Sequence, residues 1–296
     1  MKKKRIFGFM DKILIICTAS LFMMASCSSS KKAQKMSNTN ETKAQEVGIS
    51  DVEKNRIFVT MNATFKDEER CRVAMETIVN DAYAAYGVNS HFWFRSKDGK
   101  SLFVFEQYED KKALRKAIRR FTSARISFFR SIKVIDVTVY GSISTSSKLM
   151  FAIMKPKYMD YYGGYSKNVA KTKEAGIKDF ERNRIFITTN ASFKDEEKCK
   201  VAMKGLVEDT YAESGINSHF WCRSKKDGKS LFVLEQYADE KALIEHLIEN
   251  PSSRADFFES IDVGDVNIYG TESDTIKEMF DSLNPMYMNY YGGYSK

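Results

Sequence analysis

The sequence of 296 residues contains the same unit twice in tandem. Residues 48–97 align with residues 176–225 at a constant offset of 128, and about two thirds of the aligned positions are identical. A one-residue insertion in the second copy raises the offset to 129, which persists to the last residue. Two copies of roughly 120 residues predict two similar domains, because a solenoid has more and shorter repeats. We expect copy 1 at residues 48–167, a linker at 168–175 and copy 2 at 176–296.

Each copy has a readable order of strands and helices. In copy 1, alternating β-rich sequence predicts four strands, at residues 56–65, 88–96, 101–108 and 133–140. The Asp98-Gly99 pair predicts a hairpin between the second and third strands. Apolar residues at helical spacing predict an amphipathic helix over 66–86 and another from Asp110. This order is that of a ferredoxin-like βαββαβ unit, an α+β fold whose antiparallel sheet carries both helices on one face.

Side chains alternate along a strand, so each predicted strand divides into two faces. One face of copy 1 is apolar, and we expect it to carry the helices; its members are Ile57, Val59, Met61, Ala63, Phe92, Phe94, Phe103, Phe105, Val137 and Val139. The other face is polar and aromatic, and holds Thr60, Asn62, His91, Trp93, Arg95, Glu106, Tyr108, Asp136 and Tyr140. Copy 2 repeats this pattern, so the two sheets can close face to face. We expect an intramolecular dimeric α+β barrel with a polar and aromatic interior, in a monomeric chain.

Three short motifs carry a family resemblance. They are Gly-Val-Asn-Ser-His-Phe-Trp-Phe-Arg-Ser from Gly87 to Ser96, the pair Glu106-x-Tyr108, and in copy 2 Glu235-x-Tyr237 followed by Leu243 and His246. They resemble the antibiotic-biosynthesis-monooxygenase family of dimeric α+β barrels. The resemblance implies two ferredoxin-like units, here supplied by one chain, and activities that include cofactor-free oxygenation of quinols and anthrones, with haem degradation in one branch. Copy 1 has Ala117 where copy 2 has His246, which suggests that one half alone keeps a working site.

The candidate catalytic residues are an asparagine and a histidine in each copy. Asn62 and Asn190 fall in the middle of the first strand, where an amide can hold an oxyanion or bound O2. Haem-degrading relatives use an asparagine on this strand; the alternative is an amide that bonds across the sheets. His91 and His219 are candidate bases for a phenolic proton. The alternative is a histidine whose hydrogen bonds are satisfied within the fold.

The candidate ligand-binding residues are Trp93, Arg95, Glu106, Tyr108, Trp221, Arg223, Glu235, Tyr237 and His246. Arg95 and Glu106 fall on adjacent strands of one hairpin, which predicts a structural ion pair, with an arginine that holds an anionic ligand group as the alternative. Arg223 and Glu235 repeat this arrangement. His246 falls in the apolar stripe of its helix, which favours packing or capping. Three histidines without an acid cluster argue against a metal site, and we expect no cofactor outside the haem branch.

Three of the five cysteines fall in predicted elements. Cys71 and Cys199 occupy core positions of helices, and Cys222 falls on the strand face that we expect to pack against helices. All three are predicted to be buried free thiols.

A tyrosine-rich segment ends each copy, at residues 156–167 and 285–296, and contains Tyr-Tyr-Gly-Gly-Tyr. The glycines permit a close approach of two backbones. The segment can serve as a lid over a barrel mouth, or it can cover a sheet edge or extend the barrel.

The N-terminus predicts export. A basic start at Lys2 to Arg5 and an apolar run from Ile13 to Met24 form a signal peptide over residues 1–26. The small residues before Cys27 resemble the lipobox of bacterial lipoproteins, which implies acylation of Cys27 and a lipid anchor in the cell envelope. The alternative is an ordinary signal peptide with an incidental Cys27. Residues 27–47 are polar, as in a flexible tether.

The net charge does not favour nucleic acid as a partner. Residues 1–26 carry five basic residues and one acidic residue, so their removal lowers the charge from +8 to +4. The sequence favours an envelope lipoprotein that binds a small aromatic or quinone-like molecule, with cofactor-free monooxygenation as its candidate activity. The alternatives are a ligand-binding or scaffolding lipoprotein without catalysis and a haem-binding or haem-degrading relative.

Overall fold

The computed structural model describes residues 55–85, 87–120, 123–166, 183–211, 213–249, 251–271 and 273–295. The predicted signal peptide, Cys27, the tether and the linker at 168–175 lie outside the described residues. Within the described ranges, no helix is long and apolar enough to cross a membrane.

The first half follows the predicted order and adds further elements. They are β1 (Ile57–Phe65), α3 (Glu68–Tyr83), β2 (Val88–Ser96), β3 (Ser101–Tyr108), α4 (Lys111–Arg119), α5 (Ser123–Ser131), β4 (Ile132–Tyr140), α6 (Thr145–Phe151), the short 3-10 helix η1 (Ala152–Met154) and β5 (Lys157–Ser166). The bounds of β2 and β3 match the prediction, and α5 was not predicted. Asp67 and Asp110 cap α3 and α4 by accepting hydrogen bonds from backbone N–H groups of the first turn.

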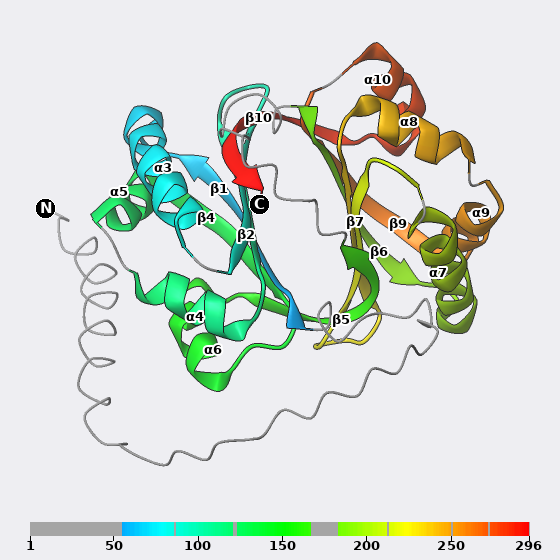
Figure 1. Cartoon of the computed structure of the whole chain (residues 1–296), viewed down its shortest axis with the longest axis horizontal. Helices are drawn as coiled ribbons and strands as arrows, with labels where there is room; N and C mark the ends of the chain where they lie inside the picture. The colour runs from blue at the N-terminus through cyan, green and yellow to red at the C-terminus, as the bar shows by residue number, and fades with distance from the viewer. Residues whose placement is uncertain are drawn as a thin grey trace, which may run out of the picture.

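The second half repeats these elements in the same order. They are β6 (Ile185–Phe193), α7 (Glu196–Tyr211), β7 (Ile216–Ser224), β8 (Ser230–Tyr237), α8 (Glu240–Glu249), α9 (Pro251–Glu259), β9 (Ile261–Tyr269), α10 (Asp274–Phe280), the 3-10 helix η3 (Asp281–Leu283) and β10 (Met286–Ser295). Figure 1 shows the two halves side by side, each with its helices on the outside of the strands.

All of these strands form one closed barrel in the order β1-β3-β2-β10-β9-β6-β8-β7-β5-β4. Within it, β4-β1-β3-β2 and β9-β6-β8-β7 each have the strand order of a ferredoxin-like unit. The predicted fold class, two such units in one intramolecular α+β barrel, is therefore confirmed.

The tyrosine-rich segments are the strands that join the halves. β10 pairs with β9 of its own half and with β2 of the first half, and β5 pairs with β4 and with β7 of the second half. The segments therefore extend the barrel and are not lids. Gly164 and Gly293 have φ values of +110° and +134°, and a Cβ there would lie 1.9 Å and 2.1 Å from the carbonyl oxygens of His219 and His91. Only glycine fits these two pairings.

The barrel interior is aromatic, as predicted, but it is mostly apolar, so the predicted place of the histidines and glutamates there is wrong. Buried Thr60 and Thr188 lie within hydrogen-bond distance of the hydroxyls of Tyr140 and Tyr269. The buried apolar members of the interior are Phe58, Phe92, Phe94, Phe103, Phe105, Tyr140, Met159, Phe186, Phe220, Cys222, Phe232, Leu234, Tyr269 and Met288. Aromatic rings of the two halves meet there, with 4.4 Å between the centroids of Phe58 and Phe220 and 4.3 Å between those of Phe103 and Tyr269. The interior is filled by these contacts and joins the halves into one core.

The misplaced residues are those of β2 and β3, because the register of β3 against β1 differs from the one assumed in the prediction. Val59 lies opposite Glu106 and Thr60 lies opposite Phe105, so the phenylalanines of β3 share a face with Thr60. The β3 phenylalanines therefore do not lie on the face of Val59, where strand alternation alone predicts them. Cys222 accordingly lies in the barrel interior rather than against the helices, although it is a buried free thiol as predicted, as are Cys71 and Cys199.

Candidate functional site

The polar residues of β2 and β3 lie between the sheet and the helices of the first half. Trp93, Val104 and Tyr108 belong to the same buried cluster as Val59 and the α3 residue Ile78. The second half repeats this layer. The predicted histidines, tryptophans, glutamates and tyrosines therefore come together, but in two separate layers outside the barrel interior.

A histidine lies within hydrogen-bond distance of a glutamate in each layer. His91 Nε2 lies 2.8 Å from Glu106 Oε1, and the hydroxyl of Tyr108 donates to Glu106 Oε2 at 2.5 Å. Burial acts to raise the pKa of Glu106, but the charge and hydrogen bond of His91 outweigh it and lower that pKa to about 2. Burial and the Glu106 charge raise the pKa of Tyr108 well above its ordinary value. Glu106 is thus a carboxylate and Tyr108 a neutral donor.

The second half contains the same three groups. His219 Nε2 lies 2.8 Å from Glu235 Oε1, and the Tyr237 hydroxyl donates to Glu235 Oε2 at 2.8 Å. Burial is again outweighed by the charge and hydrogen bond of His219, and the pKa of Glu235 is lowered to about 2. Both halves therefore hold an ionised glutamate against a buried histidine.

A cavity of about 100 Å³ adjoins the pair in the first half. It is lined by Val59, Met61, Ile78, His91, Trp93, Val104, Glu106, Tyr108, Ile118, Arg125, Phe128, Phe129, Val137, Phe151 and Met154. Most of the wall is apolar, and the polar groups are few, which is typical of a small-molecule site. The His91 ring lies 4.5 Å from that of Trp93, whose indole N–H is buried and finds no acceptor among the described residues. A ligand oxygen in the cavity can accept that hydrogen bond.

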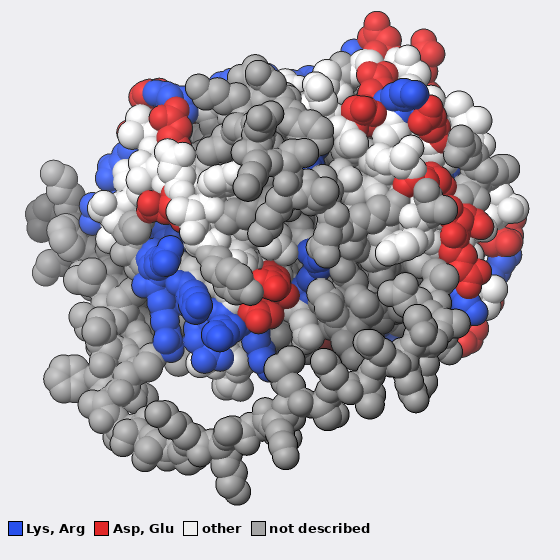
Figure 2. Space-filling view, viewed as in Figure 1, with Lys and Arg blue, Asp and Glu red and all other residues white. Residues whose placement is uncertain are grey.

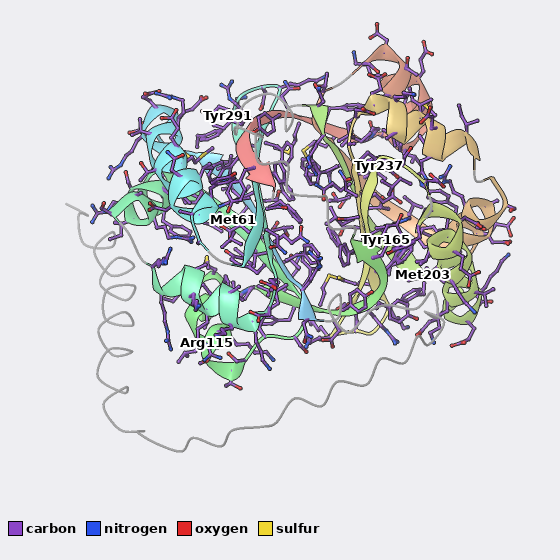
Figure 3. All side chains as sticks on the ribbon, viewed as in Figure 1. Met61, Arg115, Tyr165, Met203, Tyr237 and Tyr291 are labelled. Atoms are coloured by element: carbon purple, nitrogen blue, oxygen red, sulfur yellow. The ribbon has the colours of Figure 1, made fainter. Side chains whose placement is uncertain are left out.

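We call β5 and β10 the exchanged strands, because each pairs with a strand of the opposite half. Each of them adds a tyrosine to the layer of that opposite half. Tyr294 of β10 lies beside His91, with 6.5 Å between the ring centroids, and Tyr165 of β5 lies 6.4 Å from His219. The Tyr165 hydroxyl also bonds to Thr210 at 2.9 Å. Figure 3 shows Tyr165 among the elements of the second half, close to Tyr237. Neither layer is complete without a residue of the other copy.

The predicted ion pair between Arg95 and Glu106 is wrong. Arg95 Nη2 lies 3.0 Å from Glu68 Oε2 of α3, and its guanidinium lies over the ring of Tyr291. Tyr291 also donates to Glu68. Glu106 takes His91 as its partner instead, because the two residues are directly opposite in the β2–β3 register.

The second half repeats this correction. Arg223 pairs with Glu196 of α7 at 3.0 Å and lies over the ring of Tyr162, while Glu235 is held by His219. Both arginines therefore fix the exchanged strand to a helix, at the edge of the layer.

The predicted partnership of the asparagines with the histidines is also wrong. Asn62 alternates with the layer-facing Met61 along β1, and it donates to Asp136 Oδ1 at 3.1 Å. Asn190, its equivalent, is exposed. An amide on this side of the sheet is separated by the sheet from His91 and cannot hold an oxyanion that His91 generates.

Three residues of the layers were missed by sequence reasoning. Arg125 lines the cavity from α5, and its charge adds to that of His91 in lowering the pKa of Glu106. Tyr165 and Tyr294 arrive on the exchanged strands. Arg125 recurs as Arg254 at the offset of 129, and this repetition was the available signal.

His246 is buried, as its place in the apolar stripe predicted. Its Nδ1 lies 3.1 Å from Glu213 Oε2, and its ring lies 5.5 Å from that of Tyr237. Burial lowers the pKa of His246 to about 3. Over the described part of the chain, no group of three acidic, histidine or cysteine side chains could hold a metal ion.

No family model and no curated protein matches the chain. Solved structures are similar to it in fold. A "putative monooxygenase" from Lactobacillus acidophilus NCFM is 14% identical over 72% of this chain and 91% of its own, with a TM-score of 0.49. A "putative monooxygenase" from Fusobacterium nucleatum is 14% identical over 81% and 89%, with a TM-score of 0.46.

SnoaB from Streptomyces nogalater, described as a cofactor-independent oxygenase, is 8% identical over 31% of this chain and 95% of its own, with a TM-score of 0.28. Their descriptions name monooxygenases and an oxygenase, the class of protein that the motifs resemble, while the barrel fold of this chain is confirmed by its own strand order. At these identities the likeness concerns the fold and not the chemistry of the site.

Proposed function

We propose that the first half binds a single-ring phenol or quinol in the cavity beside His91 and oxygenates it without a cofactor. The observation that carries the proposal is the juxtaposition of a mostly apolar cavity of about 100 Å³ with the His91–Glu106 pair. An engineered apolar cavity of roughly 150 Å³ holds one benzene ring, so this size fits one ring at most. The indole N–H of Trp93 supplies a donor to a ring oxygen.

His91 is the proposed base. In its neutral form His91 donates its Nε2 proton to the Glu106 carboxylate, which leaves Nδ1 as the nitrogen that takes the phenolic proton. Glu106 stabilises the imidazolium that forms, and Tyr108 holds the other oxygen of Glu106 in place. The apolar wall keeps water from the resulting anion.

The chemistry balances without a redox cofactor. The quinol anion has carbanion character at a ring carbon, which adds O2 to give a hydroperoxide. Loss of water leaves one oxygen atom on the ring, so that one quinol and one O2 yield one hydroxyquinone and one water. The electrons that reduce O2 come from the quinol.

The site does not fit haem. A cavity that admits one ring is too small for a macrocycle, and Asn62, the residue of the haem-degrading pattern, lies on the other face of the sheet. No step of the proposed reaction uses haem.

The test is O2 consumption and product formation with a panel of single-ring quinols. We expect turnover above the buffer rate, a loss of at least tenfold in His91→Ala, and little change in the matched variant His219→Ala. Equal rates with protein and buffer would sink the catalytic proposal. Saturable quinol binding without turnover would then favour the non-catalytic ligand-binding alternative.

We further propose that acylated Cys27 anchors the protein to the bacterial envelope. The support is the lipobox-like sequence together with the basic α4 surface, which Figure 2 shows as a cluster of Lys and Arg on the first half. This surface comprises Lys111, Lys112, Arg115, Lys116 and Arg119, and such residues favour anionic headgroups. Cys27→Ser is expected to abolish incorporation of labelled palmitate and to release the protein from the membrane fraction; incorporation that persists would contradict the anchor.

A further inference from the structure

The two halves have the same His-Glu-Tyr group but differ in the residues around it. The His-Glu-Tyr groups, both tryptophans and most of the surrounding apolar residues recur at the repeat offsets. Several positions change from apolar in copy 1 to polar in copy 2: Met61, Ala82 and Ala124 become Thr189, Thr210 and Ser253, and the largest changes are from Ala85 and Ala117 to Glu213 and His246. The last two differences interact, because His246 Nδ1 lies within hydrogen-bond distance of Glu213 Oε2, at 3.1 Å.

His246 occupies more space beside its layer than the equivalent residue of copy 1, Ala117, can fill. Its side chain is only 2% exposed, and its ring lies 6.1 Å from that of His219 and 5.5 Å from that of Tyr237. In copy 1 the equivalent residue Ala117 is buried, and the residue that follows it, Ile118, lines the cavity. An imidazole at this position occupies the side of the layer next to the glutamate and its tyrosine.

An arginine repeats beside the layer in both halves, as Arg125 and Arg254. In the first half Arg125 lines the cavity and acts on Glu106. In the second half the equivalent Arg254 donates to the backbone oxygens of His246 and Leu247, at 2.8 Å and 2.7 Å. These bonds hold the end of α8, and with it His246, against the layer. His246 lies close enough to Glu235 for its charge to act on the pKa of that glutamate.

We propose that the second half is a closed copy of the site, in which His246, held by Glu213 and Arg254, is a plug that fills the ligand space. Positions 117 and 246 then decide which half accepts a ligand, and the chain binds one aromatic molecule rather than two. The ligand class rests on the proposed function, whereas the plug rests on the packing alone.

Xenon tests the plug without the proposed ligand, because it enters apolar cavities of this size. Crystals of the protein under xenon pressure are expected to show xenon in the first half only. The double variant Ala85→Glu with Ala117→His, which copies the second half into the first, is expected to lose it. The reverse double variant, Glu213→Ala with His246→Ala, is expected to gain xenon in the second half. Changing both residues together avoids leaving Glu213 charged and buried without its histidine.

Phenol binding by equilibrium dialysis provides the second readout. We expect one phenol per wild-type chain, none per Ala85→Glu/Ala117→His chain and two per Glu213→Ala/His246→Ala chain. Circular dichroism and thermal unfolding establish that each variant is folded. Xenon in both wild-type halves, or in neither half of the reverse variant when it is folded, would overturn the plug. The predicted xenon pattern without any phenol binding would instead overturn the proposed ligand and leave the plug standing.

Discussion

Tyr294, near the end of the second copy, lies beside His91 of the first copy, with 6.5 Å between the two ring centroids. The contact exists because β10 leaves its own half and pairs with β2, where Tyr294 is the register partner of His91. The equivalent strand β5 brings Tyr165 to His219. The duplication therefore produced two layers that depend on each other, as subunits of a dimer with exchanged strands do.

Gly293→Ala is expected to disrupt the exchanged strand. A Cβ at Gly293 would lie 2.1 Å from the His91 carbonyl oxygen, at a φ of +134° that alanine rarely adopts. We expect a loss of at least ~2 kcal/mol in the free energy of unfolding, measured by urea denaturation. The matched control is Gly292→Ala, because its Cβ would meet only the Trp93 ring, at 3.6 Å. Equal stability of the two variants would contradict this assignment of the strand.

The exchange also predicts that the halves unfold together. Phe58 and Phe220 come from different halves, and their ring centroids lie 4.4 Å apart in the shared interior. Phe58→Ala and Phe220→Ala should each cost ~3–5 kcal/mol and lower the midpoint of one common calorimetric transition. Phe258→Ala is the control, because that side chain is 41% exposed. Two separate transitions would show that the halves are independent.

Local structure could be predicted from the sequence, whereas the pairing and register of distant strands could not. The hairpin β2–β3 was placed correctly because alternation and the Asp98-Gly99 turn are local signals. Alternation shows which residues of one strand share a face, but not which face of the next strand joins them, and so His91 was placed in the interior. The pairing of β10 with β2 joins residues about 200 positions apart, and no local pattern encodes it.

The three described cysteines should resist thiol reagents in the native state. Cys71, Cys199 and Cys222 are buried, and burial raises the pKa of each thiol, to about 11 for Cys71. Since the thiolate is the reactive form, a colorimetric thiol reagent should label none of them until urea unfolds the protein. Peptide mapping identifies the labelled sites. Rapid native labelling of Cys222 would mean that the barrel interior opens readily.

Lowering the pH is expected to destabilise the protein through His246 of the second half, at pH values above those at which Glu106 and Glu235 titrate. The pKa of His246 is lowered by burial to about 3, from its ordinary value of 6.5, so the unfolded chain binds a proton over this range that the folded chain does not. The contribution of His246 to the free energy of unfolding is complete above pH 6.5. It falls as the pH drops below 6.5, with a limiting slope of ~1.4 kcal/mol per pH unit from this one group. Glu106 and Glu235, whose pKa values are lowered to about 2, add to the loss only below about pH 4.5.

The measurement is the free energy of unfolding from urea titrations at pH 7, 6 and 5, where the glutamates stay ionised in both states. The wild-type protein should lose stability over this range, and Glu213→Ala/His246→Ala should show a shallower slope because the neutral buried imidazole is gone. His91→Ala serves as the comparison, since it removes a histidine of the first half and leaves His246 in place. If Glu213→Ala/His246→Ala keeps the wild-type slope, His246 is charged or solvated in the folded state, and it does not pack as a neutral ring against His219 and Tyr237.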